Sequence, residues 1–305
     1  MLLPPNSKYL RFSWLLGAAS VGLAILTSAS LKADVLLLDH FDYLTGNTLT
    51  NYGWLLIPSS GGAATPVVTN NLSYTGFAQS SGNAVQLRPN GQDWYKTFTT
   101  QTYTTSDTAS LYYSFLMRVD DLGLLSSTGG YFAGLGGTNG LSMGATVAIR
   151  AADGGFQLGV GKRDSTGIGD YSFSDMVFSL GSTILVVGSY NFISGPINND
   201  TASLWLNPVE SSFGQSSTPT ATLTTAVSGI NNDLLSYSSF VLKPQGGTTS
   251  TQIPGSLIFD ELRVGNTWAD VTPFLLSVWG GQGADGNWGT AANWQNGLVP
   301  TNGAP

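Results

Sequence analysis

The sequence contains no cysteine, which excludes disulfide bonds, zinc–thiolate sites and a cysteine nucleophile. Histidine is almost absent as well: His40 is the single copy, so a metal centre built on several imidazoles is excluded. A domain of this size can dispense with disulfides because its core is large. We expect His40 to lie at the end of the first strand, in a structural role.

Charge is scarce too, since only 10% of the residues are charged and acidic groups outnumber basic ones by 18 to 11. Three of the basic residues, Lys8, Arg11 and Lys32, lie in a segment that we expect to be removed, which makes the mature chain more acidic still. No basic run is present. The sequence offers no cluster of positive charge that could bind a nucleic-acid backbone, so nucleic-acid binding is not expected.

Long hydrophobic runs are absent after the N-terminal region. Residues 14–26 form an apolar segment with Lys8 and Arg11 before it and small residues after it. This layout predicts a secretory signal peptide over residues 1–33, cleaved after Ala29 or Ala33. The run is short for a spanning helix, which needs about 20 apolar residues, so an uncleaved anchor is the alternative. We expect a secreted or bacterial cell-surface protein with no membrane span in the mature chain.

Short alternating segments and glycine, by contrast, are abundant. In residues 109–119 the side chains of Leu111, Tyr113, Phe115 and Met117 fall on one face at a period of two. Further alternating segments are 34–42, 146–150, 156–161, 182–192, 201–207, 239–243 and the start of 257–273. No helical pattern separates them, which disfavours parallel βαβ units. We predict an all-β fold in which antiparallel strands form two packed sheets.

The segment Leu257–Pro273, LIFDELRVGNTWADVTP, resembles the closing strand of laminin-G-like and concanavalin A-like jelly rolls in secreted bacterial proteins. Other short patterns resemble the opening of the laminin-G-like family: Phe41-Asp42-Tyr43 with Gly46 and Leu49, Gly53-Trp54, Leu72 with Tyr74 and Gly76, and Gly82-Asn83-Ala84. The resemblance implies a two-sheet antiparallel jelly-roll sandwich of the concanavalin A-like class over residues 34–273. It also implies that calcium could be bound at loop ends by oxygen ligands.

Composition changes over residues 274–305. Trp279, Trp288 and Trp294 lie among Gly, Asn and Ala, and Pro300 ends the pattern. This spacing resembles the opening unit of autotransporter-type β-strand repeats, which need stacked neighbours to bury a face. We expect a linker and the truncated start of a surface repeat, with association to the outer membrane if the repeat continues.

Glutamate is rare, and this bears on enzyme activity. Concanavalin A-like jelly rolls include retaining glucanases, whose two catalytic carboxylates lie about 5 Å apart. Those enzymes place Glu, Asp and Glu on one strand face, but this chain has only Glu210 and Glu261, neither in such a run. No spacing nominates a pair of aspartates instead. We assign no catalytic residue.

Asp260 is the first candidate metal ligand. A period of two places it on one face with Ile258, Leu262 and Val264, so its carboxylate is expected to point toward the core. A buried carboxylate must be hydrogen-bonded, paired or bound to a metal. Backbone N–H groups are one set of partners for Asp260, and calcium is the other.

Asp200 with Asn198 and Asn199 is a second candidate calcium site. The same chemistry is found in Asp120 with Asp121 and in Asp164 with Asp170. Each set is equally well explained by turns, because Asn and Asp side chains mimic backbone hydrogen bonds there. Calcium is the one cofactor that the sequence suggests.

Sugar binding requires an exposed aromatic ring with polar neighbours. The candidates are Trp54, Trp94 with Tyr95, Tyr131 and Trp205. The first four lie in turn-rich segments, and Trp205 faces away from its apolar neighbours, which would place it on an outer sheet face. The alternative is that these rings belong to the core of a large sandwich.

These features predict a non-catalytic extracellular module that binds a polysaccharide or another cell-surface partner. One alternative is a structural spacer or cap of a surface repeat protein. The other is a carbohydrate-active hydrolase or lyase that uses aspartates.

Overall fold

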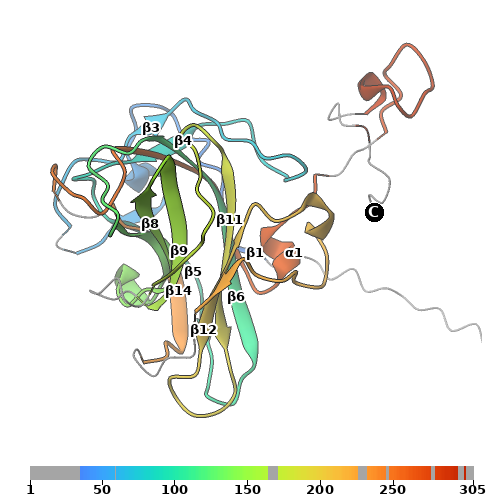
Figure 1. Ribbon diagram of the computed structural model, residues 1–305. Helices are drawn as coiled ribbons and strands as arrows, with labels where there is room; N and C mark the ends of the chain where they lie inside the picture. Colours follow the sequence, from blue (N-terminus) through green and yellow to red (C-terminus); the bar gives the residue numbers. More distant parts are fainter. Residues whose placement is uncertain are drawn as a thin grey trace, which may run out of the picture. The chain divides into compact units, whose positions relative to one another are not determined.

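The computed structural model describes residues 35–58, 60–163, 171–225, 232–244, 247–275, 279–294 and 299. Two antiparallel sheets, of eight and seven strands, pack face to face as a sandwich, which confirms the predicted all-β jelly-roll fold. Figure 1 shows β6, β11 and β12 in one layer and β8, β9 and β14 in the other. The predicted signal peptide lies outside the described residues.

Strand order follows a jelly-roll pattern in both sheets. The eight-stranded sheet contains, in order, β13 (Leu223–Thr224), β12 (Thr201–Leu206), β11 (Ile184–Phe192), β6 (Ala109–Asp121), β15 (Ser256–Gly265), β4 (Ala84–Leu87) and β3 (Val67–Val68), and β1 (Val35–Asp39) also pairs with β15. The seven-stranded sheet contains β10 (Tyr171–Phe173), β9 (Gly155–Arg163), β8 (Gly144–Ala152), β7 (Gly130–Gly136), β14 (Ser236–Leu242), β5 (Trp94–Thr102) and β2 (Trp54–Leu56).

Helical structure is confined to single turns among the described residues. These are η1 (Leu49–Tyr52), η2 (Thr138–Gly140), η4 (Glu210–Ser212), α1 (Trp268–Val271) and η5 (Ala291–Asn293). Within the same residues, no helix has the length and apolar character needed to cross a bilayer.

The main core lies between the sheets and follows the predicted alternation. The side chains of Leu111, Tyr113, Phe115 and Met117 on β6 are all fully buried there. Phe115 stacks on Phe259 of β15 with ring centroids 4.4 Å apart, and Phe240 of β14 approaches both from the facing sheet. Such aromatic pairs contribute about 0.5–1.5 kcal/mol each beyond the burial of their area.

The central strand β15 departs from simple alternation at a bulge. Its register with β6 shifts after Asp260, and Glu261 has a φ of 56°. One extra residue reverses the faces, so Leu262 points into the main core while Asp260 lies on the outer side with Ile258. The prediction that Asp260 shares a face with Leu262 is therefore wrong, because the bulge lies between them.

A second apolar cluster covers part of the outer face of the eight-stranded sheet. It contains Leu72, Phe77, Ala84, Leu116, Leu185, Val187, Trp205, Phe213, Ile258, Trp268 and Val271. The one-turn helix α1 contacts β15 and β6 there (Figure 1). Its N-terminus is closed by a capping box, in which the Asp270 backbone N–H donates to the Thr267 hydroxyl.

Residues 279–294 contain a small structure organised by Asn293. Its side chain is fully buried, donates to the carbonyls of Asp285 and Asn287, and accepts from the Gly283 N–H. Trp288 and Trp279 stack with centroids 5.7 Å apart. The assignment of this segment to a surface repeat stays a prediction.

Candidate functional site

The outer face of the seven-stranded sheet carries one row of side chains across four strands. Cα pairing places Tyr131 of β7 beside Ala148 of β8, Ala148 beside Gly159 of β9, and Gly159 beside Phe173 of β10. Tyr131 packs against a small outer cluster that includes Tyr95 and is separate from the main core. The middle of this row is therefore floored by small residues, with aromatic rings on either side.

Two glycines of β9 allow the rings of β10 to lie close over the sheet. A methyl group at Gly159 would come within 2.8 Å of the Phe173 ring, and one at Gly161 within 2.6 Å of the Tyr171 ring. Tyr171 in turn stacks on Tyr131, with centroids 6.3 Å apart and an interplanar angle of 17°. We call Tyr131, Tyr171 and Phe173 the aromatic strip; all three are partly exposed.

Basic side chains lie at both sides of the aromatic strip. The Nζ of Lys243 donates to the Tyr131 hydroxyl at 3.0 Å and lies 5.2 Å from its ring centroid. The guanidinium of Arg150 lies 4.2 Å from the centroid of Phe173. Cation–π contacts of this kind contribute about 0.5–1 kcal/mol at exposed positions.

A polar pocket of about 350 Å³ lies near Lys243. Asp93 and Pro244 are among its lining residues, together with Ser60 and Asn90. Burial raises the pKa of Asp93 to about 6, although the charge of Lys243 lowers it. A carboxylic acid with that pKa exchanges its proton close to neutral pH.

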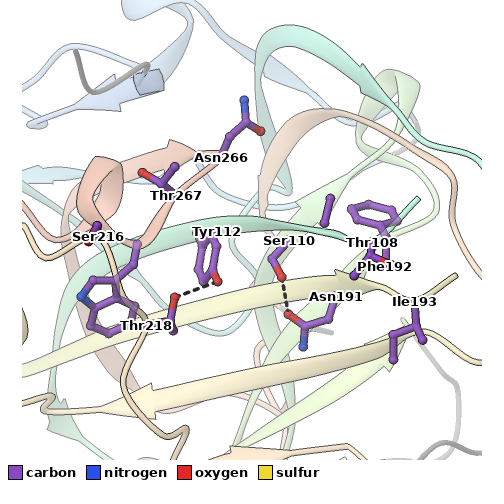
Figure 2. A pocket seen from close by; sticks show the side chains of 12 residues that line it. Thr108, Ser110, Tyr112, Asn191, Phe192, Ile193, Ser216, Thr218, Asn266 and Thr267 are labelled. Carbon is purple, nitrogen blue, oxygen red and sulfur yellow. Dashed lines mark hydrogen bonds between the residues drawn. The ribbon is translucent and has the colours of Figure 1, made fainter. Parts of the chain in front are cut away.

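A larger groove, of about 460 Å³, lies on the outer face of the other sheet. Figure 2 shows Ser110 and Asn191 hydrogen-bonded to each other, and Tyr112 hydrogen-bonded to Thr218. The lining residues carry hydroxyl, amide and apolar groups but no charge. Trp268, which also lines the groove, is buried, so its ring offers a sugar no open face.

Most of the aromatic residues predicted to bind sugar are buried. Trp54 has no exposed surface and donates to Asp39 at 2.8 Å, and Trp94 is buried and donates to Thr65 at 3.0 Å. Tyr95 is 8% exposed and lies in the outer cluster beneath Tyr131. The platform prediction is wrong for Trp54 and Trp94, because the sandwich uses their rings as core and their N–H groups in buried hydrogen bonds.

Trp205 and Tyr131 have different outcomes. Trp205 does lie on the outer side of its sheet, as predicted, but it is 5% exposed because a loop covers it. Its indole N–H donates to the carbonyl of Pro219 at 2.9 Å, and its ring packs against Trp268. Tyr131 alone of the predicted rings is part of the aromatic strip.

Asp260 is held by backbone groups. Its side chain accepts from the Leu72 N–H at 3.0 Å and the Glu261 N–H at 2.8 Å. Burial raises its pKa to about 8, so the carboxyl is largely protonated at neutral pH. Backbone N–H groups, the first of the two predicted sets of partners, therefore hold this carboxyl.

Glu261 belongs to the same buried network as Asp260. It accepts from His40 at 2.8 Å, from Arg263 at 3.0 Å and from the Ser80 N–H at 2.7 Å. Burial opposes its ionisation, but these hydrogen bonds and the charge of Arg263 lower its pKa. The hydrogen bond to Glu261 raises the pKa of His40. His40 therefore has the expected structural place after β1.

The candidate calcium ligands near Asp200 include two buried oxygens, Asn198 Oδ1 and Asp200 Oδ2, to which the described residues donate no hydrogen bond of normal geometry. The Nζ of Lys162 lies 2.5 Å from Asp233 Oδ1, and Asp233 also accepts from the Asn198 N–H. An ammonium beside these oxygens opposes a second cation. Among the described residues, no cluster of three Asp, Glu or His side chains suits a metal.

The other candidate ligands are explained locally. Asp120 forms an ion pair with Arg118 at 2.6 Å, and Asp121 accepts from the Gly123 N–H, as turn chemistry predicts. Asp164 and Asp170 lie outside the described residues.

Sequence reasoning missed a Gly-x-Ser-x-Gly pattern, Gly140-Leu141-Ser142-Met143-Gly144. Ser142 is exposed and has a φ of 56°, as a strained turn requires. A nucleophile elbow leads from a strand into a helix, whereas this turn leads into β8. The single histidine is bound to Glu261 in the other sheet, so the pattern has no imidazole base.

The aromatic strip was hidden from sequence reasoning for a physical reason. Tyr171 and Phe173 lie on a three-residue strand whose alternation is too short to detect. The available signal was the pair Gly159 and Gly161, since glycine inside a strand often marks a close approach.

Comparison with known proteins identifies no family. No family model matches the chain, and no curated protein is similar to it. The laminin-G-like assignment therefore stays a prediction.

Several solved structures are similar to this chain. An alginate lyase bound to an alginate trisaccharide is 15% identical, with 75% of this chain and 97% of that chain covered at a TM-score of 0.43. An endo-beta-1,4-glucuronan lyase from Trichoderma reesei is 16% identical, with 72% and 94% covered at 0.39. The globular domain of T. cruzi calreticulin is 10% identical, with 76% and 88% covered at 0.42. At these values the likeness does not bear on function.

Proposed function

We propose that the protein binds a polysaccharide along the aromatic strip. The observation that carries this proposal is the stack of Tyr131 on Tyr171 beside Phe173, on a sheet face floored by Ala148 and Gly159. Partly exposed rings offer flat apolar faces to the C–H groups of a sugar, and the hydroxyls of the two tyrosines supply polar contacts.

The dimensions favour a chain over a single sugar. The row from Lys243, at the end of β14, to Phe173 on β10 crosses four strand spacings, or about 19 Å at about 4.8 Å each. A site of that length contacts several consecutive sugars. We further propose that binding takes place outside the cell, on the basis of the N-terminal pattern of residues 1–33.

A glycan panel tests the proposal, probed with the whole protein in the presence of calcium and again with a chelator. Tyr131→Ala and Tyr171→Ala are each expected to weaken binding about 2- to 10-fold, from about 0.5–1.5 kcal/mol per lost aromatic contact. The matched control is Thr218→Ala in the groove of Figure 2. No binding to any glycan in either condition would refute the proposal, and a loss confined to the control would move the site to the groove.

A lyase activity is a second candidate, favoured by the position of Asp93 near Lys243, whose Nζ donates to the Tyr131 hydroxyl. In elimination from a uronate, a base removes the proton next to the carboxylate, the freed pair forms a C=C bond, and the glycosidic C–O bond breaks as the leaving oxygen is protonated. Asp93 would take the first proton and the Tyr131 hydroxyl would supply the second. The test is ultraviolet absorbance of an unsaturated product, which Asp93→Asn should abolish; no product from any uronan excludes this activity.

A further inference from the structure

Three basic side chains lie on the face that carries the aromatic strip. Arg150 points away from the core because it is next to the core residue Ile149 on β8. Arg163 also points away from the core, because it is an odd number of residues from the core residue Val160 on β9. Lys243 follows β14 and reaches Tyr131. In an acidic protein, this concentration of positive charge on one face distinguishes the strip from the uncharged groove on the other sheet.

Arg150 differs from the basic residues that stabilise the fold. Ion pairs with carboxylates are formed by Lys96 with Asp39, Arg118 with Asp120, Lys162 with Asp233, and Arg263 with Glu261. Arg150 instead donates its Nε–H to the neutral amide oxygen of Gln157 at 2.9 Å and lies over the ring of Phe173. Arginine has five N–H donors in a planar fork, and Gln157 accepts only one of them.

The stack of Arg150 on Phe173 holds the guanidinium at the surface of the strip. Gln157 sits opposite Arg150 on the neighbouring strand, so the side chain is oriented from two directions. A guanidinium held in this way pairs bidentately with a planar carboxylate, a geometry that lysine does not reproduce.

Asp93 is the carboxyl group at the opposite side of the strip, where it lines the pocket near Lys243. Because burial raises its pKa to about 6, part of it is uncharged at mildly acidic pH, and Lys243 offsets the remainder. The Arg150 side keeps its positive charge over the same range, since a guanidinium does not lose its proton.

We propose that the strip selects polysaccharides whose sugars carry carboxylate groups, and that Arg150 binds such a carboxylate while the neighbouring sugar packs against Tyr131 and Tyr171. This inference rests on the proposed polysaccharide binding and adds the chemical class of the ligand. Sulfated chains are the competing class, and the experiment separates them.

The test uses matched pairs of polymers: polyglucuronate, polymannuronate and polygalacturonate, each beside its carboxyl-reduced neutral form, with dextran sulfate as a sulfated arm. The expected result is tighter binding to at least one uronan than to its reduced partner. Arg150→Gln should weaken uronan binding about tenfold and leave binding to the reduced polymer unchanged, since it removes a charge-assisted hydrogen bond. Arg150→Lys should recover only part of the loss.

Arg118→Gln serves as the control, because it removes a surface arginine of the other sheet that is already paired with Asp120. Thermal melts establish that each variant is folded. Equal binding of a uronan and its reduced form, or binding of dextran sulfate alone, would overturn the choice of carboxylate while leaving polysaccharide binding in place. Failure of every polymer in this set and of every glycan in the panel to bind would overturn the proposed function itself.

Discussion

Replacing Gly161 by alanine is expected to weaken polysaccharide binding without unfolding the protein. The new methyl group would lie 2.6 Å from a Tyr171 ring carbon and 3.0 Å from the Thr146 hydroxyl. Ordinary contacts begin at about 3.4 Å, so the ring must move by about 0.8 Å. That movement disturbs the stack on Tyr131, which is part of the proposed sugar platform.

The cost to stability should be small. The atom in the way is the far end of a partly exposed side chain on an edge strand, which can turn aside. Substitution of glycine by alanine also gains about 0.4–1 kcal/mol from the unfolded chain, which offsets the displacement. We therefore expect the free energy of unfolding to change by less than about 1 kcal/mol and the affinity to fall about 2- to 10-fold.

Isothermal titration with the best polymer of the panel measures the affinity, and chemical denaturation measures the stability. Gly286→Ala is the matched control, because a methyl group there meets nothing within 4 Å. Gly159→Ala should behave differently, since its methyl group would also lie 2.8 Å from the backbone carbonyl of Ser172 and must displace the strand. Unchanged affinity in Gly161→Ala, together with an altered near-ultraviolet tyrosine signal, would show that the strip does not bind the ligand.

Three further predictions concern the buried polar groups. His40→Ala removes the charged pair of His40 with Glu261 and should lower the melting temperature most near pH 5.5, above the ordinary pKa of Glu261 (4.5) and below that of His40 (6.5). The loss should shrink as the pH rises through the raised pKa of His40; a pH-independent difference would contradict the pairing. Asp260→Ala should cost about 1–3 kcal/mol in urea denaturation at pH 6, where the carboxyl is protonated, because the Leu72 N–H loses its partner; an unchanged midpoint would refute this. Because the ammonium of Lys162 opposes a second cation near Asp200, melting curves with calcium and with chelator should coincide. A calcium-dependent stabilisation that Asp200→Asn abolishes would refute this; calcium bound at about 100 times its Kd would contribute about 2.7 kcal/mol.

Much of the fold follows from the sequence alone. The alternation of Leu111, Tyr113 and Phe115 is a property of neighbouring residues, and it correctly identifies the buried face of β6. The same local argument locates most of the long strands and explains why glycine-rich turns separate them. It also indicates that Trp205 faces outward, because side-chain direction along a strand depends only on the period of two.

Exposure and register were decided by the tertiary structure. Trp205 faces outward yet is buried, because the connection between β12 and β13 and the ring of Trp268 cover it. Trp54, predicted to be a surface ring, donates its N–H to Asp39 inside the core. The bulge at Glu261 puts Asp260 and Leu262 on opposite faces of β15. It depends on a single residue in a left-handed conformation, which cannot be deduced from composition. The aromatic strip depends on Tyr171 and on pairings between strands, which exist only once the sheet has formed.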